Sequence, residues 1–138
     1  ILEGLSNETV QNLDQFGRLL GKGFQVQDDL LELISNPQQM GKSLGSDLAE
    51  GKQTYPIILA RTNHEQEWNK CISQFMSKQN EDSMDIVKTF LEKTGIAEET
   101  ITRYESFFEE AGKVLHFLPE EKRKDLDAFI QLIKNRTY

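Results

Sequence analysis

The sequence is poor in the residues that build disulfides, transition-metal sites and membrane spans. Its 138 residues include one cysteine, Cys71, and two histidines, His64 and His116. A single cysteine excludes an internal disulfide and is compatible with a reducing compartment, so we expect a cytoplasmic location. The two histidines lie far apart in the sequence, and we interpret both as structural. No run of about 18 apolar residues occurs, which excludes a transmembrane segment.

Proline is also scarce, and acidic residues outnumber basic ones. Only three prolines interrupt the chain, and apolar residues recur three and four positions apart, which predicts an all-α fold. Acidic residues outnumber basic ones by 23 to 16, so the formal net charge is -7. Nucleic-acid binding needs Lys and Arg to neutralise phosphates, so we expect no nucleic-acid partner. A phosphorylated substrate would need a local basic site or a metal, because the overall field opposes it.

Length and hydrophobic pattern predict one helical domain. A chain of 138 residues that is 37% hydrophobic and 28% charged fits a single globular unit. The expected helices cover residues 7–35, 55–60, a segment from an Asn63 cap to about Met76, 83–94, 98–117, and a last helix opened by Pro119.

Three glycines, Gly17, Gly21 and Gly23, fall inside the first expected helix. Each costs about 1 kcal/mol relative to alanine in a helix interior. We therefore expect close packing against a neighbouring element at these positions. Phe24 is expected on the apolar side of the same helix.

Carboxylates gather near the end of this helix. Residues three and four apart share a helix face, so Asp28, Asp29 and Glu32 form one polar patch with Gln25. Carboxylates with no His or Cys nearby suit a hard cation such as Mg²⁺, which is held by one or two carboxylates plus substrate phosphates. A lone patch of this kind is often only a solvated face. Here the apolar surroundings indicate that the carboxylates point into a site.

Two lysines follow in glycine-bearing loops, Lys42 and Lys52, with Asp47 between them. Lysines supply point charges to phosphates. Together with the carboxylates, they predict a site for a magnesium-bound diphosphate.

These residues form three linked motifs in order, and the motifs resemble those of the trans-prenyl diphosphate synthases, or polyprenyl synthetases. The motifs are Gly21-x-x-Phe24-Gln25-x-x-Asp28-Asp29-x-x-Glu32, Gly41-Lys42-x-x-Gly45-x-Asp47 and Gly51-Lys52-x-Thr54-x-Pro56. The resemblance covers the C-terminal part of the family, from its second aspartate-rich motif onward. Outside residues 17–60 it rests on helical pattern and length.

The resemblance implies the C-terminal helices of an isoprenoid-synthase-type helical barrel around a central cavity. In that cavity an allylic diphosphate ionises with the help of Mg²⁺. Its carbocation is then attacked by the double bond of isopentenyl diphosphate. The resemblance also implies a homodimer of the full-length protein.

The resemblance implies roles for individual residues. Asp28 matches the aspartate that ligates one Mg²⁺, whereas Asp29 and Glu32 match positions that hold metal-bound water or complete the outer shell. Glu32 stands where the family usually has Asp, and one extra methylene still reaches a bridging water.

The remaining motif residues match positions that face the substrate. Gln25 matches a glutamine that lines the cavity near the allylic substrate. Lys42 and Lys52 match the lysines that neutralise the leaving diphosphate, where preorganised cations stabilise the developing charge.

The first aspartate-rich motif of the family does not occur in these 138 residues. The chain also begins at Ile1 without Met, as though partway through an element. We therefore expect residues 1–138 to be the C-terminal half of a polyprenyl synthetase domain, as a truncation or a proteolytic remnant. We expect this chain alone to be inactive, because one metal-binding wall cannot clamp the diphosphate.

Three alternatives remain open at this point. A non-catalytic regulatory or interaction subunit of a heteromeric synthase would have little reason to keep Gln25, Asp28 and both lysines together. A class I terpene cyclase fragment typically carries an Asn/Ser/Glu motif with a different spacing, which is absent here. An acidic helical scaffold without a ligand is the third.

Overall fold

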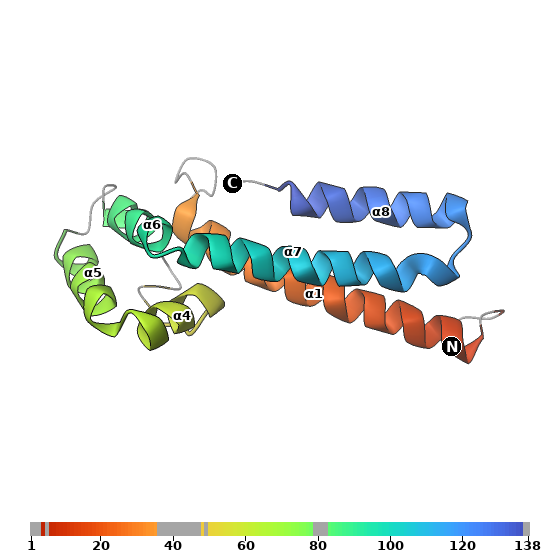
Figure 1. Cartoon of the computed structure of the whole chain (residues 1–138), viewed down its shortest axis with the longest axis horizontal. Coiled ribbons are helices and arrows are strands. Elements are labelled where there is room, and N and C mark those ends of the chain that lie inside the picture. Colours follow the sequence, from red (N-terminus) through yellow and green to blue (C-terminus); the bar gives the residue numbers. More distant parts are fainter. Residues whose placement is uncertain (1–3, 5, 36–47, 49, 79–82, 137–138) are drawn as a thin grey trace. The chain divides into compact units, whose positions relative to one another are not determined.

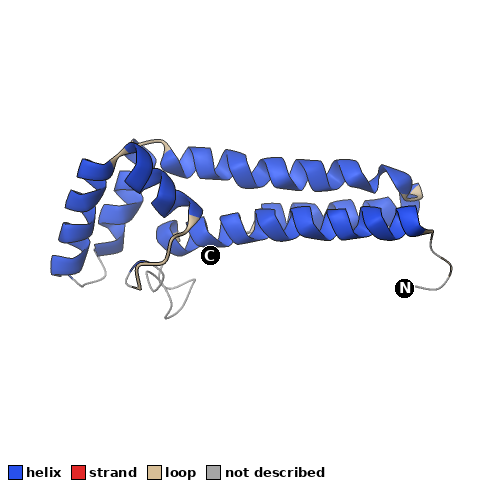
Figure 2. Ribbon diagram, turned by 90° about the horizontal axis from the view of Figure 1, so that it is seen from below, coloured by secondary structure: helices blue, strands red, loops and turns tan. Residues whose placement is uncertain are grey.

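The computed structural model describes residues 4, 6–35, 48, 50–78 and 83–136. All regular structure in these residues is helical, which confirms the all-α prediction (Figures 1 and 2). The elements are α1 (Asn7–Ile34), α4 (Tyr55–Asn63), α5 (Glu65–Lys78), α6 (Ser83–Lys93), α7 (Ile96–Val114), the 3₁₀ turn η1 (Leu115–Phe117) and α8 (Glu120–Lys134).

Local backbone chemistry explains the start of α1 and the junction between α6 and α7. The Ser6 hydroxyl accepts a hydrogen bond from the Thr9 amide at 3.2 Å and so caps the first turn of α1. Gly95 separates α6 from α7 with φ of 78°, a left-handed conformation that glycine adopts without strain. The helix expected over 98–117 begins two residues earlier, at Ile96, and its last turn tightens into η1.

The expected helix cap at Asn63 is wrong. Asn63 is the last residue of α4, and α5 begins at Glu65. His64 lies between them and serves both helices. Its amide donates to the Ala60 carbonyl at 2.9 Å, and its carbonyl accepts from the Trp68 amide at 2.8 Å.

The described residues divide into two compact units, one formed by those up to Gln25 together with 103–136 and the other by those from Val26 to Thr102. In the first unit, α7 and α8 run antiparallel and are joined through η1 (Figure 1). Phe108, Ala111, Leu115 and Ile130 are buried here. The Tyr104 and Phe108 rings pack with centroids 5.9 Å apart, so these aromatic residues belong to a packed core.

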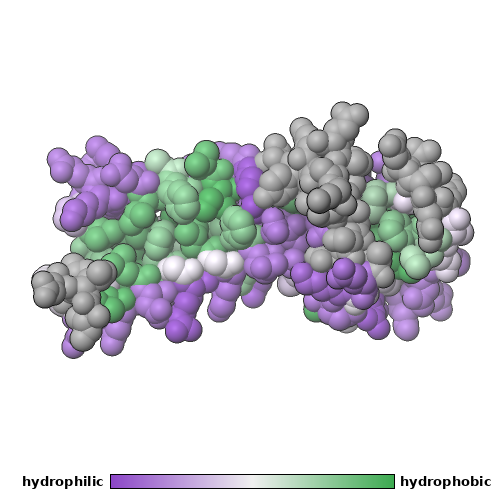
Figure 3. All heavy atoms as spheres, turned by 180° about the vertical axis from the view of Figure 1, so that it is seen from behind, coloured by the Kyte–Doolittle hydropathy of each residue, from purple (hydrophilic) through white to green (hydrophobic). Residues whose placement is uncertain are grey.

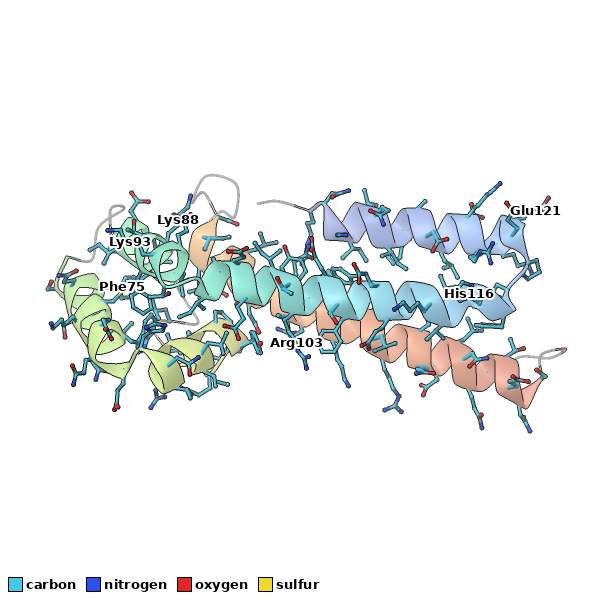
Figure 4. The ribbon with its side chains drawn as sticks, viewed as in Figure 1. Phe75, Lys88, Lys93, Arg103, His116 and Glu121 are labelled. Carbon is cyan, nitrogen blue, oxygen red and sulfur yellow. The ribbon has the colours of Figure 1, made fainter. Side chains whose placement is uncertain are left out.

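The surface of the first unit keeps some apolar side chains exposed. Figure 3 shows apolar side chains gathered in a broad band over its helices. Phe129 and Leu132 of α8 are exposed large hydrophobic residues. On α7, the guanidinium carbon of Arg103 lies 4.6 Å from the centroid of the Phe107 ring (Figure 4).

The second unit packs α5 against α4 and α6. Trp68 and Phe90 place their ring centroids 5.4 Å apart, and His64 meets the Phe90 ring edge-on at 6.4 Å. These contacts support the structural role expected for His64.

Cys71 is buried in this unit, and burial raises the pKa of its thiol to about 11. The thiol is therefore protonated and poorly nucleophilic at neutral pH.

The packing expected around the α1 glycines is right at one position and wrong at two. At Gly23 a Cβ would lie 2.5 Å from Cε1 of Phe108, so only glycine fits. At Gly17 and Gly21, within the described part of the chain, no atom of another element comes within 4 Å of a Cβ. The Phe24 side chain, expected on the apolar side of α1, is not buried. It is 40% exposed, and the Arg136 guanidinium carbon lies 4.0 Å from its ring centroid.

None of the described helices is both long enough and apolar enough to cross a membrane.

The contrast between the glycines gives a stability prediction. Gly23→Ala should lower the free energy of unfolding by about 1–2 kcal/mol, because overpacking a buried ring outweighs the gain in helix propensity. Gly17→Ala, the matched control, should raise it by up to about 1 kcal/mol. Urea unfolding of both purified variants measures the difference. Equal effects of the two substitutions would contradict the packing of Phe108 on Gly23.

Candidate functional site

The last two turns of α1 carry the predicted carboxylates. Leu30 and Leu33 are only 1% and 2% exposed, so they fix this end of the helix in the core. Asp28 and Asp29 directly precede Leu30, Glu32 directly precedes Leu33, and all three are half-buried. Each of the three carboxylates also has an interaction partner. The structure therefore holds them at the boundary between core and solvent, where the local dielectric is lower than in water.

This segment of α1 carries one exposed and one buried glutamine. Gln25 is exposed, whereas Gln27 is fully buried. Gln27 lies four residues after Gly23 and three before Leu30, so helical periodicity places it on the buried stripe. Buried amides are normally hydrogen-bonded, and Gln27 does have an interaction partner. The periodicity could have identified it.

Lys52 lies in a short turn that leads into α4. Gly51 adopts φ of 73°, and its amide donates to the Leu48 carbonyl at 3.1 Å. The Thr54 amide donates to the Lys52 carbonyl at 3.2 Å. Lys52 itself is exposed at the surface of the turn and has an interaction partner. Lys42 and Asp47 lie outside the described residues.

Thr54 is the N-cap residue of α4, but its side chain makes no cap hydrogen bond. Its backbone is extended, with φ of -90° and ψ of 164°. Its Oγ1 is buried and makes no hydrogen bond to any residue that the structure describes. One reason is that Pro56 occupies the second helical position and has no N–H to offer.

The donor set fits a hard divalent cation, but it does not form a complete site. Carboxylate oxygens are suitable ligands for Mg²⁺. Across residues 4, 6–35, 48, 50–78 and 83–136, no three His, Cys, Asp or Glu side chains converge where a metal could lie. Since Mg²⁺ usually takes only one or two carboxylates and completes its shell with water and phosphates, the α1 carboxylates suit a metal that arrives with a diphosphate.

Comparison with protein families tests the resemblance that the motifs suggested. The sequence model of the family described as "Polyprenyl synthetase" matches residues 1–94. The chain belongs to the polyprenyl synthetase family. The matched region contains α1, the Lys52 turn and α4.

Curated relatives within the family include octaprenyl diphosphate synthase of Escherichia coli. It is 33% identical over 121 residues, which are 87% of this chain and 38% of that protein. Geranylgeranyl diphosphate synthase of Methanosarcina mazei is 45% identical over 60 residues, which are 44% of this chain and 18% of that protein. This chain thus spans less than half the length of the relatives it matches.

Solved structures share the fold. Geranylgeranyl pyrophosphate synthetase from Pyrococcus horikoshii aligns with a TM-score of 0.78 at 26% identity, over 95% of this chain and 40% of that one. Heptaprenyl diphosphate synthase from Staphylococcus aureus gives 0.79 at 24% identity, over 96% and 42%. A polyprenyl synthase from Caulobacter crescentus, crystallised with calcium and isoprenyl diphosphate, gives 0.79 at 24% identity, over 98% and 42%. The helical fold expected from the motifs is therefore confirmed.

The buried Thr54 hydroxyl, which makes no cap hydrogen bond to α4, gives a second stability prediction. Thr54→Val keeps the side-chain shape and removes a buried hydroxyl that makes no hydrogen bond to any described residue, so the free energy of unfolding should rise by about 1 kcal/mol. The matched control is Thr100→Val, since the buried Thr100 hydroxyl donates to the Ile96 carbonyl at 2.7 Å. That control should lose about 0.5–1.5 kcal/mol. A destabilised Thr54→Val protein would mean that this hydroxyl is already bonded in the free protein.

Proposed function

We propose that this chain is the C-terminal half of a prenyl diphosphate synthase domain. The parent enzyme would condense an allylic diphosphate with isopentenyl diphosphate to make a trans-polyprenyl diphosphate. The proposal is carried by one observation: α1 holds Asp28, Asp29 and Glu32 at the edge of the core in a chain of this family. The Lys52 turn, which adds an exposed cation, supports it.

The proposed roles follow from the chemistry of diphosphate departure. The family uses a divalent metal, and we assign Mg²⁺ to Asp28, with Asp29 and Glu32 in the outer shell. A bound Mg²⁺ would act as a Lewis acid and neutralise charge on the diphosphate oxygens. Lys42 and Lys52 would bind the same diphosphate and stabilise the charge that grows as its bond to carbon breaks. Gln25 would contact the allylic substrate from the preceding turn of α1.

We further propose a cytoplasmic location and a homodimeric parent. The lone cysteine supports the first, and family resemblance supports the second. The alternative of a non-catalytic subunit is less well supported, because such a subunit has no need for half-buried carboxylates and a lysine turn in one chain.

Substitutions in the full-length synthase would test the carboxylate roles. Glu32→Ala should lower kcat/KM by about 10–100-fold, as loss of an outer-shell group does, and Asp28→Ala should lower it about tenfold further. Steady-state condensation assays with farnesyl diphosphate and Mg²⁺ would measure both. Asp85→Ala, which removes an exposed carboxylate on α6, is the control and should leave kcat/KM unchanged. If Asp28→Ala and Glu32→Ala lower kcat/KM equally and only slightly, the assignment of Asp28 as the metal ligand is wrong.

The purified 138-residue chain should not elongate prenyl diphosphates. It contains one aspartate-rich motif, and we expect two facing carboxylate walls to be needed to clamp the metal and diphosphate. Incubation with Mg²⁺, farnesyl diphosphate and radiolabelled isopentenyl diphosphate, followed by chromatography of extracted products, would measure elongation. Detection of a longer prenyl product above the no-enzyme background would refute this expectation.

A further inference from the structure

We propose that Gln53 and Arg61 are positioning residues that hold the Lys52 turn in place. The proposal rests on the diphosphate-binding role of Lys52 given above. It assigns no contact with substrate to Gln53 or Arg61. They would act through the backbone on either side of Lys52.

Two hydrogen bonds connect the body of α4 to this turn. The Arg61 Nη1 donates to the Gln53 Oε1 at 2.7 Å. The Gln53 Nε2 donates in turn to the Gly51 carbonyl at 3.1 Å. The two bonds share one side-chain amide, so they brace the backbone on both sides of Lys52 from a residue two turns into α4.

The brace adds to two backbone hydrogen bonds of the turn, from the Gly51 amide to the Leu48 carbonyl and from the Thr54 amide to the Lys52 carbonyl. Gly51 is a glycine in the left-handed region, and glycine has the widest backbone freedom of any residue. Thr54, which normally would fix the helix entry, makes no side-chain cap bond. The Arg61 bond is charge-assisted, which strengthens it. It also polarises the Gln53 amide and favours the second bond to Gly51.

Direct binding of the diphosphate by Arg61 is the competing explanation. Arg61 lines an open polar hollow of about 460 Å³, which is bounded also by Gln53, Ile58, Thr62, Glu65 and Asn69. The Glu65 carboxylate in the same hollow opposes an anionic ligand there. Charge therefore favours an indirect role for Arg61.

Steady-state kinetics of the full-length synthase would test the proposal. Arg61→Ala and Gln53→Ala should each lower kcat/KM for farnesyl diphosphate about three- to tenfold, the range expected for the loss of one hydrogen bond. Arg61→Lys, which keeps a charged donor, should recover part of that loss. Lys88→Ala removes an exposed cation from α6 and is the charge-matched control, with kcat/KM unchanged (Figure 4).

The decisive comparison is made in a Lys52→Ala background. If Arg61 acts only through Lys52, adding Arg61→Ala to the Lys52→Ala variant should not lower kcat/KM any further. An undiminished effect would mean that Arg61 touches the substrate, and the positioning role would be overturned. If Arg61→Ala leaves kcat/KM unchanged while Lys52→Ala lowers it, the positioning role is also overturned, but the proposed function stands. A harmless Lys52→Ala would instead remove the proposed role of Lys52, and the positioning role with it.

Hydrogen exchange gives a readout that does not depend on activity. Arg61→Ala should speed exchange of the Thr54 amide, which bonds to the Lys52 carbonyl, about three- to tenfold. The melting temperature should move by less than about 2 °C, because Arg61 and Gln53 are exposed. Unchanged exchange at Thr54 would show that the brace does not hold the turn.

Discussion

The burial of leucines along the last turns of α1 is the constraint on which the candidate site depends. Leu30, Leu31 and Leu33 are buried and leave little freedom for the helix to rotate. Asp28 and Asp29 directly precede these leucines and Glu32 lies between Leu31 and Leu33, so all three carboxylates are held half out of water. A carboxylate in this position loses part of its hydration, which makes a cation a better partner than it would be at an open surface. The packing of the leucines thus places the carboxylates where they attract a cation more strongly.

Much of this could be predicted from sequence because local chemistry decides it. Ser6, Gly95 and Pro119 mark helix boundaries through backbone conformation and capping, and the structure places boundaries beside them. The order and spacing of the motifs were enough to indicate the family. The sequence could not show that Gly17 and Gly21 lack close packing or that Phe24 is exposed. Periodicity says which residues share a face, but it does not say which element, if any, lies opposite.

The parts of the site that sequence reasoning missed are contacts between residues in different local structures. Gln53 is in a turn and Arg61 is in a helix, and neither belongs to a recognisable pair until the turn has folded back along α4. The absence of a side-chain cap bond from Thr54 to α4, in the part of the chain that the structure describes, likewise could not be predicted, since threonine before a helix normally predicts a cap. The chain is acidic overall, so a phosphate-binding lysine gains more from exact placement than from the surrounding field.

The burial of Cys71 has a practical consequence for spectroscopy. Its thiol is shielded by packing and remains protonated at the pH of ordinary labelling reactions. Within this chain, the protein therefore behaves as a background without reactive cysteine. A single cysteine introduced at an exposed site can carry a spin label or a fluorophore without removing the native residue. Pairs of such labels would measure distances between α1 and the Lys52 turn in solution.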